Sequence, residues 1–290
     1  MTVVIAVFTG CRNQVAIKRL DGTTIAAAEI DATIERLMKA AEVPGLGIAV
    51  LNDGNVVYLK AYGVRDNERN LPLTVDSAMY AASFSKSVFA YMVMQLVEKE
   101  SLDLDKPVYQ YLPNPLPEYP SYKDLANDTR YKQITARMLL SHTSGFANWR
   151  LLEEDRKLHI HFAPGSRYVY SGEGIVLLQL VVDNITKRPL EELMQQLVFQ
   201  PLGMTRTSMV WQDRLKADFA NEHDEFGRSL GADKRTAAEA AGSMQTTIAD
   251  FRRFIQAVLD GKGLSKRSRE EMLSPQIQIK SKHEFPTFDG

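Results

Sequence analysis

Residues 81–98 read AASFSKSVFAYMVMQLVE and contain the only Ser-x-x-Lys spacing in the chain. The apolar spacing predicts a helix from Ser83 to Glu98, with one stripe made of Val88, Met92 and Leu96. Side chains three residues apart lie on the same face of a helix, so the Ser83 hydroxyl and the Lys86 amine should meet within one turn.

This pair has the chemistry of a nucleophile and its base. Ser83 begins the predicted helix, where unpaired backbone N–H groups and the helix dipole favour developing negative charge. A lysine that is buried can lose its proton, because desolvation disfavours an ammonium. Serine beside such an amine can attack a carbonyl without histidine. The alternative, a capping serine followed by a solvated lysine, is the commoner fate of one isolated motif.

Tyr170 is the second candidate for chemistry. It follows Phe162-Ala163-Pro164-Gly165 and directly precedes an apolar pattern that predicts a helix from Gly172 to Ile185. A tyrosine at such a junction can face a cleft and move protons. The alternative is a core tyrosine with a satisfied hydroxyl group.

The remaining pattern predicts an α+β chain. Two β-prone runs between Gly45 and Val64 flank Asn52-Asp53-Gly54, a strong signal for a tight hairpin. A single hairpin is marginal alone, so we expect further strands, of which residues 265–290 supply at most one. Further helices are predicted for 30–41, from Thr135, for 189–197 and from Thr247, and residues 103–132 are expected to form a long ordered loop.

Composition excludes several classes of function. The 290 residues carry 35 basic and 36 acidic side chains, a net charge of -1, without the basic stripe that nucleic-acid binding needs. No apolar run approaches the roughly 18 residues that span a bilayer. Cys11 is the single cysteine, so the chain can form no internal disulfide and has no Cys-x-x-Cys metal or redox motif.

Short motifs in a fixed order add a resemblance. They are Pro44-Gly45-Leu46, Tyr62-Gly63, Ala82 to Lys86, Leu139-Leu140-Ser141-His142-Thr143-Ser144-Gly145, Pro164-Gly165, Tyr170-Ser171, Pro201-Leu202-Gly203-Met204 and Ala241-Gly242-Ser243-Met244. From about Ile30 to about Pro275 the sequence resembles the serine β-lactamase and penicillin-binding protein superfamily, specifically the class C-like branch with its esterases and D-amino-acid peptidases. The resemblance implies an α+β, β-lactamase/transpeptidase-like fold, with an antiparallel sheet flanked by helices and a helical lobe.

The resemblance also implies roles for individual residues. Ser83 would be the acylated nucleophile and Lys86 its proton partner, while Tyr170 would be the general base that activates water or another acceptor. The Ser83 backbone N–H would form half of an oxyanion hole. Ser171 and Gly172 would contact the substrate. His142 lies in a marker that is structural in the family, so no catalytic role is expected for it.

Two departures from the family pattern bear on activity. Gly172 stands where the family has an asparagine whose amide contacts the substrate's acyl-amide group and the lysine; its loss favours simple esters, and Glu173 is the neighbouring candidate substitute. The third motif, Lys or His, any residue, then Gly, is not found before Gly290. We therefore expect residues 12–290 to be one β-lactamase-related domain that is incomplete at its C-terminus and lacks sheet strands.

The expected function is hydrolysis through an acyl-enzyme of a carboxylic ester, a β-lactam or a D-amino-acid peptide. The alternative is a catalytically incomplete fragment, or a penicillin-binding-like protein that binds ligand or is acylated without efficient turnover. No cofactor is implied. His159 and His161 could share one face of a strand, but two ligands make no metal site, so no metal is expected.

The N-terminus suggests export. Residues 1–10, MTVVIAVFTG, form a short apolar segment before Cys11 and resemble the end of a bacterial lipoprotein signal, although no Lys or Arg precedes the apolar stretch. In this interpretation residues 1–11 are a signal remnant and Cys11 tethers a periplasmic or membrane-anchored protein. The alternative is a first strand with a free thiol, in a cytoplasmic protein.

Overall fold

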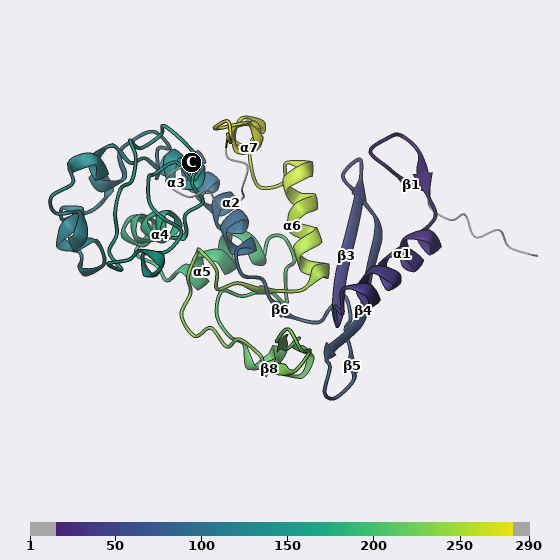
Figure 1. Ribbon diagram of the computed structural model, residues 1–290. Coiled ribbons are helices and arrows are strands. Elements are labelled where there is room, and N and C mark those ends of the chain that lie inside the picture. Colours follow the sequence, from purple (N-terminus) through teal and green to yellow (C-terminus); the bar gives the residue numbers. More distant parts are fainter. Residues whose placement is uncertain (1–15, 281–290) are drawn as a thin grey trace, which may run out of the picture.

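A computed structural model describes residues 16–280, so the proposed signal at residues 1–11, including Cys11, lies outside the described residues. Figure 1 shows a sheet with helices on one side of the molecule and a helical lobe on the other. Helix α6, Ile248–Asp260, stands between the sheet and helix α2, Phe84–Glu98. Ser83 and Lys86 lie at the start of α2, where these two parts meet, and Tyr170 comes just before helix α4, Gly172–Thr186.

The predicted hairpin forms the main sheet. Strands β3 (Gly45–Asn52) and β4 (Asn55–Asp66) pair antiparallel, and the short β5 (Leu71–Pro72) pairs with the other edge of β4. Asp53 and Gly54 have φ angles of 52° and 77°. Positive φ at both central residues is what a two-residue hairpin turn needs, which explains the Asp-Gly signal in the sequence.

Helices cover both faces of this sheet. Helix α1 (Ala27–Ala40) carries Asp31, whose carboxylate lies 2.9 Å from the Lys60 ammonium and accepts hydrogen bonds from the hydroxyls of Tyr58 and Tyr62. Residues 58, 60 and 62 share one face, because side chains alternate along a strand. Gly47 pairs with residue 61 and so lies on the opposite face, where it packs against Ile248 of α6.

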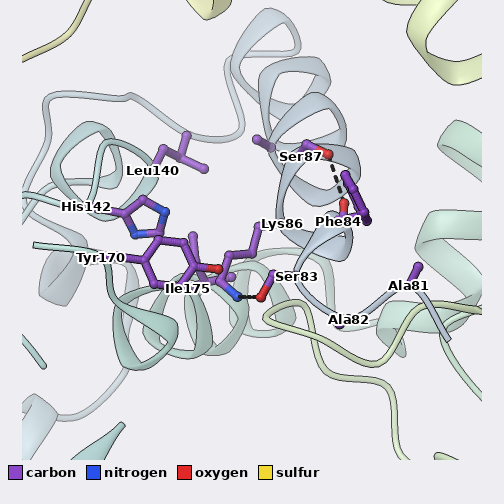
Figure 2. Close-up of a pocket in the computed structure, with 11 residues that line it drawn as sticks. Ala81, Ala82, Ser83, Phe84, Lys86, Ser87, Leu140, His142, Tyr170 and Ile175 are labelled. Carbon is purple, nitrogen blue, oxygen red and sulfur yellow. Dashed lines mark hydrogen bonds between the residues drawn. The ribbon is translucent and has the colours of Figure 1, made fainter. Parts of the chain in front are cut away.

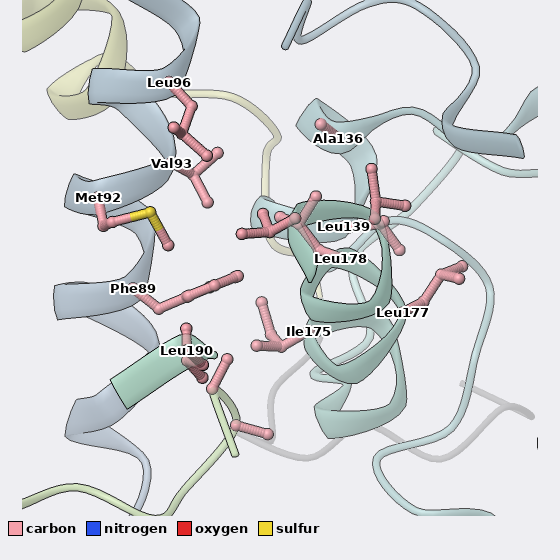
Figure 3. Close-up of a cluster of buried hydrophobic side chains, with 14 of the residues drawn as sticks. Phe89, Met92, Val93, Leu96, Ala136, Leu139, Ile175, Leu177, Leu178 and Leu190 are labelled. Atoms are coloured by element: carbon pink, nitrogen blue, oxygen red, sulfur yellow. The ribbon is translucent and has the colours of Figure 1, made fainter. Parts of the chain in front are cut away.

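Helix α2 is the core of the lobe. Nine of its fifteen side chains are buried, so it is apolar almost all round, as a helix enclosed by others must be. Figure 3 shows Phe89, Met92 and Val93 of α2 facing Ile175 and other apolar side chains of helix α4, Gly172–Thr186.

The remaining elements are short. In the lobe they are the 3-10 turns η1 (Val108–Tyr111), η2 (Leu116–Glu118), η3 (Pro120–Leu125), η4 (Thr129–Gln133) and η5 (Arg150–Leu152), helices α3 (Ala136–Leu140) and α5 (Leu190–Met194), and the π-helix η6 (Gln195–Phe199). Elsewhere they are β1 (Ile17–Lys18), β2 (Thr24–Ile25), β6 (Met79–Tyr80), η7 (Asp213–Asp218), β7 (Glu222–His223), β8 (Ser229–Gly231), β9 (Gln245–Thr246) and α7 (Lys266–Leu273).

Most predicted elements are confirmed. Thr135 and Thr247 cap α3 and α6, each accepting a hydrogen bond from the backbone N–H three residues on. Residues 103–132 form ordered 3-10 turns rather than long elements. Residues 266–273 form helix α7, which the sequence pattern does not predict, and within residues 16–280 strand β3 pairs only with β4. Among the described residues no helix is long and apolar enough to cross a membrane.

Candidate active site

Ser83 precedes the first turn of α2 with its side chain accessible. Its backbone is in the right-handed helical region, and its hydroxyl caps no backbone N–H, which contradicts the alternative of a capping serine. Ala82 just before it has a φ of 43°, a left-handed conformation that an alanine rarely adopts. Within residues 16–280 the Ser83 backbone N–H donates no hydrogen bond, so it remains free to meet an oxyanion.

Lys86 is buried beside Ser83. The residue is 7% exposed, and its Nζ donates a hydrogen bond to Ser83 Oγ over 3.0 Å and another to the Ala241 carbonyl oxygen. Figure 2 shows the side chains of Ser83, Lys86 and Tyr170 converging on one point. The alternative of a solvated lysine is therefore wrong, and the Ser-x-x-Lys pair lies together as the helical spacing predicts.

A two-stranded ladder brings Ala241 to the lysine. Strand β6 pairs with β9, and this pairing continues as a hydrogen bond of 2.8 Å from the Ala81 N–H to the Met244 carbonyl. The Met244 N–H in turn donates to Ser85 Oγ over 3.0 Å. The chain around Ala241 is thus fastened to both sides of Ser83, although about 155 residues separate them.

Tyr170 faces Lys86 from the opposite wall. The lysine Nζ lies 5.0 Å from the centroid of the tyrosine ring, within the range of a cation–π contact. The ring also packs against the imidazole of His142, with centroids 4.6 Å apart and planes tilted by 39°. Tyr170 is half-buried and lines the cavity, so the alternative of a core tyrosine does not describe its position.

His142 packs against Tyr170 and supports this wall. Its Nδ1 accepts a hydrogen bond from the Ser171 N–H over 3.1 Å, so a neutral ring carries its proton on Nε2. Burial, together with the positive charge of Lys86, lowers the pKa of His142 to about 4. At neutral pH the His142 imidazole is therefore uncharged.

Ser171 has a structural role at the start of α4, and its expected contact with the substrate stays a prediction. The residue is fully buried, and its hydroxyl donates to the Ala147 carbonyl over 2.8 Å while it accepts from the Gly174 N–H over 2.9 Å. It is the N-cap of α4. Gly172 is also buried and lies outside the cavity lining, and its expected contact with the substrate likewise stays a prediction.

Glu173 does not replace the absent asparagine. Its carboxylate pairs with the Arg150 guanidinium through contacts of 2.6 and 2.8 Å and also accepts from the Arg150 N–H over 2.9 Å. Its side chain is 7% exposed. Because both of its oxygens accept hydrogen bonds from Arg150, the Glu173 carboxylate stabilises the lobe and takes no part at the reacting centre.

These residues enclose a cavity of about 530 Å³. Ser83, Lys86, His142 and Tyr170 form part of its wall. The other lining residues do not follow from the sequence pattern; they are Ala81, Ala82, Phe84, Ser87, Ala90, Leu140 and Ile175. Apart from Ser87, these additional side chains are apolar. They come from α2, from the two residues after β6, and from α3 and α4, so no local pattern identifies them.

His159 and His161, which could have been metal ligands, each contact a carboxylate. His159 Nε2 lies 3.0 Å from both carboxylate oxygens of Asp155, and His161 Nε2 lies 2.6 Å from Glu153. In the described part of the chain, no three His, Cys, Asp or Glu side chains come together as metal ligands would.

The sequence and the structure of the chain are similar to those of known proteins. A sequence profile of the beta-lactamase family matches residues 30–287. The chain is 31% identical over 211 residues to esterase EstB of Burkholderia gladioli, covering 64% of this chain and 52% of that protein. The crystal structure of D-alanine carboxypeptidase AmpC from Burkholderia cenocepacia superposes with a TM-score of 0.69 at 26% identity, covering 84% of this chain and 67% of that one.

A third comparison concerns the fold alone. The octameric penicillin-binding protein homologue from Pyrococcus abyssi superposes with a TM-score of 0.73 at 24% identity, covering 88% of this chain and 62% of that one. The chain thus spans about half the length of the esterase and about two thirds of the solved structures. Since the family profile covers most of the sequence, the chain belongs to the beta-lactamase family, within the serine β-lactamase and penicillin-binding protein superfamily.

Proposed function

We propose that the protein is a serine hydrolase that acts on a carboxylic ester or amide through an acyl-enzyme. The observation that carries the proposal is the contact of 3.0 Å between Lys86 Nζ and Ser83 Oγ beneath an open cavity. The relatives support the same class of reaction, because they include an esterase and a D-alanine carboxypeptidase.

In the first half-reaction Ser83 Oγ attacks the substrate carbonyl carbon, and the hydroxyl proton passes to Lys86 Nζ, which lies 3.0 Å from Oγ. The carbonyl oxygen becomes negative, and the free backbone N–H of Ser83 is in position to donate to it. The bond to the leaving group then breaks, and the alcohol or amine departs with the proton. A serine ester remains.

In the second half-reaction water takes the place of the leaving group. Tyr170 stands across the cavity from Ser83 and faces the lysine, a position suited to a base that removes a proton from water. Attack of that water breaks the bond between the acyl carbon and Ser83 Oγ and releases the acid, and the proton that Tyr170 took from the water passes to Oγ and restores the hydroxyl. His142 stays neutral and holds the tyrosine ring.

The cavity favours esters with an apolar part. Its additional wall residues are mostly aliphatic or aromatic, and Phe84 at the mouth is a largely exposed ring. Burial of such a substrate is favourable at about 0.8 kcal/mol for each CH₂ group removed from water. An ester also needs fewer oriented hydrogen bonds than a peptide or a lactam, which fits the absence of a side chain at Gly172.

The test is labelling of the intact protein with a fluorophosphonate, followed by peptide mapping. We expect the adduct on Ser83, no adduct in Ser83→Ala, and unchanged labelling in Ser101→Ala, an exposed serine beyond the far end of α2. An adduct on another residue, or none in a folded sample, would contradict the proposal.

The fate of the acyl group distinguishes turnover from capture. Intact-mass measurement after mixing with p-nitrophenyl butyrate follows the serine ester directly. Rapid loss of the added mass marks a hydrolase. An adduct that persists for hours marks the penicillin-binding type of behaviour, in which Ser83 is acylated without efficient turnover.

For localisation we propose the exported, lipid-anchored form, supported by the apolar run before Cys11. Expression of the full chain in a bacterial host with radiolabelled palmitate tests this. Label in the wild type and none in Cys11→Ser is the expected result, while equal recovery of both in the cytosolic fraction would refute it.

A further inference from the structure

A second cavity, of about 550 Å³, lies where the β4–β5 hairpin meets residues 211–234. Asn221 joins the two stretches, since its N–H donates to the Arg65 carbonyl over 2.8 Å and its side-chain amide donates to the Asp66 carboxylate over 2.8 Å. Figure 1 shows β5 and β8 at the same end of the molecule. The cavity shares no lining residue with the one that contains Ser83, so it is a separate place for a ligand.

Positive charge dominates the lining of this second cavity. Its charged side chains are four cations and one carboxylate, namely Arg65, Arg69, Lys216, Lys234 and Asp213. Asp66 pairs with Arg69 over 2.7 Å, and Asp218 lies 3.8 Å from Arg65. The two arginines therefore have carboxylates of their own, and the excess of positive charge comes from the two lysines. The chain as a whole has a net charge of -1, so this excess is a local feature.

The two lysines of the cavity have no carboxylate partner. Within residues 16–280 the ammonium groups of Lys216 and Lys234 form no ion pair and no hydrogen bond, and both residues are exposed. Asp213, the one carboxylate of the lining, already accepts a hydrogen bond from Trp211 Nε1 over 2.8 Å. Two ammonium groups whose donors are free, at the wall of one cavity, favour an anion as the ligand.

An aromatic wall lies beside one of these lysines. The Trp211 indole packs against Phe219 with ring centroids 5.0 Å apart, and Lys234 Nζ lies 5.3 Å from the centroid of the indole. The bond from Nε1 to Asp213 and one of 2.6 Å from the Trp211 N–H to the Arg235 carbonyl hold the indole in place. A fixed aromatic surface next to a free cation suits a ligand that joins an anionic group to a flat apolar body.

We propose that this cavity is a binding site for an organic anion that carries a flat apolar group, such as an aromatic carboxylate or an aryl phosphonate. The anionic group accepts hydrogen bonds from Lys216 and Lys234, and the apolar group lies against the Trp211 indole. Charge-assisted hydrogen bonds orient the anion, while removal of the apolar group from water adds to the affinity. The inference goes beyond the proposed function and does not depend on it, because none of these residues lines the catalytic cavity.

Calorimetric titration of the full chain with three small molecules tests the ligand class. Phenylphosphonate joins an anion to a ring and has no ester or amide bond that the protein could cleave, methylphosphonate keeps the anion, and benzyl alcohol keeps the ring. We expect phenylphosphonate to bind with a Kd of about 1 mM or below, and about tenfold more tightly than either of the other two. Equal affinities for the two phosphonates, or no binding of phenylphosphonate, would overturn the proposal.

A pair of double variants assigns the binding to the lysines. Lys216→Met/Lys234→Met should weaken the binding of phenylphosphonate about tenfold or more, because both charged donors are lost. The two side chains are exposed, so the fold should tolerate the change. Lys99→Met/Lys262→Met removes the same charge from two exposed positions outside the cavity and should leave the affinity unchanged. Equal weakening in the two double variants would reveal only a general effect of charge and would overturn the proposal.

Treatment with a fluorophosphonate separates the two cavities. Once Ser83 carries the adduct, phenylphosphonate should bind with the affinity that it has for the untreated protein. Loss of binding would place phenylphosphonate in the catalytic cavity and would overturn the proposal. If Ser83 does not react with the fluorophosphonate, the proposed function fails, and the lysine variants still decide whether the second cavity binds an anion.

Discussion

Lys86 Nζ lies 3.0 Å from Ser83 Oγ and donates its other hydrogen bond to the carbonyl oxygen of Ala241. The first contact is local, because one helical turn separates the two residues. The second contact is long-range, because Ala241 lies 155 residues further along the chain than Lys86. A lysine held on two sides has little rotational freedom, so the amine stays aimed at the serine before any substrate arrives.

Removal of the amine should abolish acylation. We expect Lys86→Met to lower the rate of fluorophosphonate labelling at Ser83 by about 10²- to 10⁴-fold, the usual contribution of a positioned proton acceptor. Lys99→Met, which changes an exposed lysine just after the end of α2, should leave the rate unchanged. Labelling kinetics followed by mass spectrometry decide it, and a Lys86→Met rate within threefold of the wild type would exclude the lysine as proton partner.

His142 should make the protein sensitive to acid. Its pKa is about 4 in the folded state and near 6.5 when unfolded, so between these values the unfolded chain binds more protons. Above pH 6.5 His142 therefore does not lower the free energy of unfolding. As the pH falls towards 4, the free energy of unfolding decreases by at most about 3 kcal/mol because of this residue. Urea unfolding at several pH values measures the slope.

His142→Asn is the informative variant for that slope. The side-chain oxygen of asparagine can accept from the Ser171 N–H as Nδ1 does, and asparagine tolerates the left-handed φ of 55° found here. We expect the difference in unfolding free energy between wild type and variant to shrink as the pH falls from 6.5 to 4. A difference that is constant with pH would show that His142 is not held neutral.

Ser171 should matter for stability more than for chemistry. Ser171→Ala removes the N-cap of α4 and leaves the buried carbonyl of Ala147 without its donor, so we expect a loss of about 2 kcal/mol. Ser265→Ala removes the exposed cap of α7 and should cost less. Denaturant unfolding gives both values. If Ser171→Ala instead weakened substrate binding and left the free energy of unfolding unchanged, Ser171 would contact the substrate directly.

The Arg150–Glu173 pair should behave as a buried ion pair. Arg150→Met leaves the Glu173 carboxylate, 7% exposed, without its cation and should cost about 3 kcal/mol or more. Adding Glu173→Gln to that variant should recover part of the loss, because the uncompensated charge disappears. Lys18→Met, which breaks the exposed pair with Asp53, is the control and should change little. If urea unfolding gave the same loss of stability for Arg150→Met and Lys18→Met, Arg150 and Glu173 would not form a buried ion pair that stabilises the fold.

Local features of the fold could be predicted from the sequence. The turn at Asp53-Gly54, the caps at Thr135 and Thr247 and the apolar stripe of residues 83–98 each depend on a few neighbouring residues. Helix α7 was missed, because its charged sequence has no apolar stripe and its position is set by contacts such as that of Glu271 with Arg137.

By itself the sequence determined the Ser83–Lys86 pair and the family to which the chain belongs, because one helical turn and a set of short motifs are properties of residue order. Only the tertiary structure decided that Ala241 holds the lysine, that the Ser171 hydroxyl donates to the Ala147 carbonyl, and that Trp149 occupies the space of a side chain at Gly172. These contacts join residues between 23 and 155 positions apart. They arise from strand pairing and close packing, whose geometry is set by the whole fold and not by any local spacing.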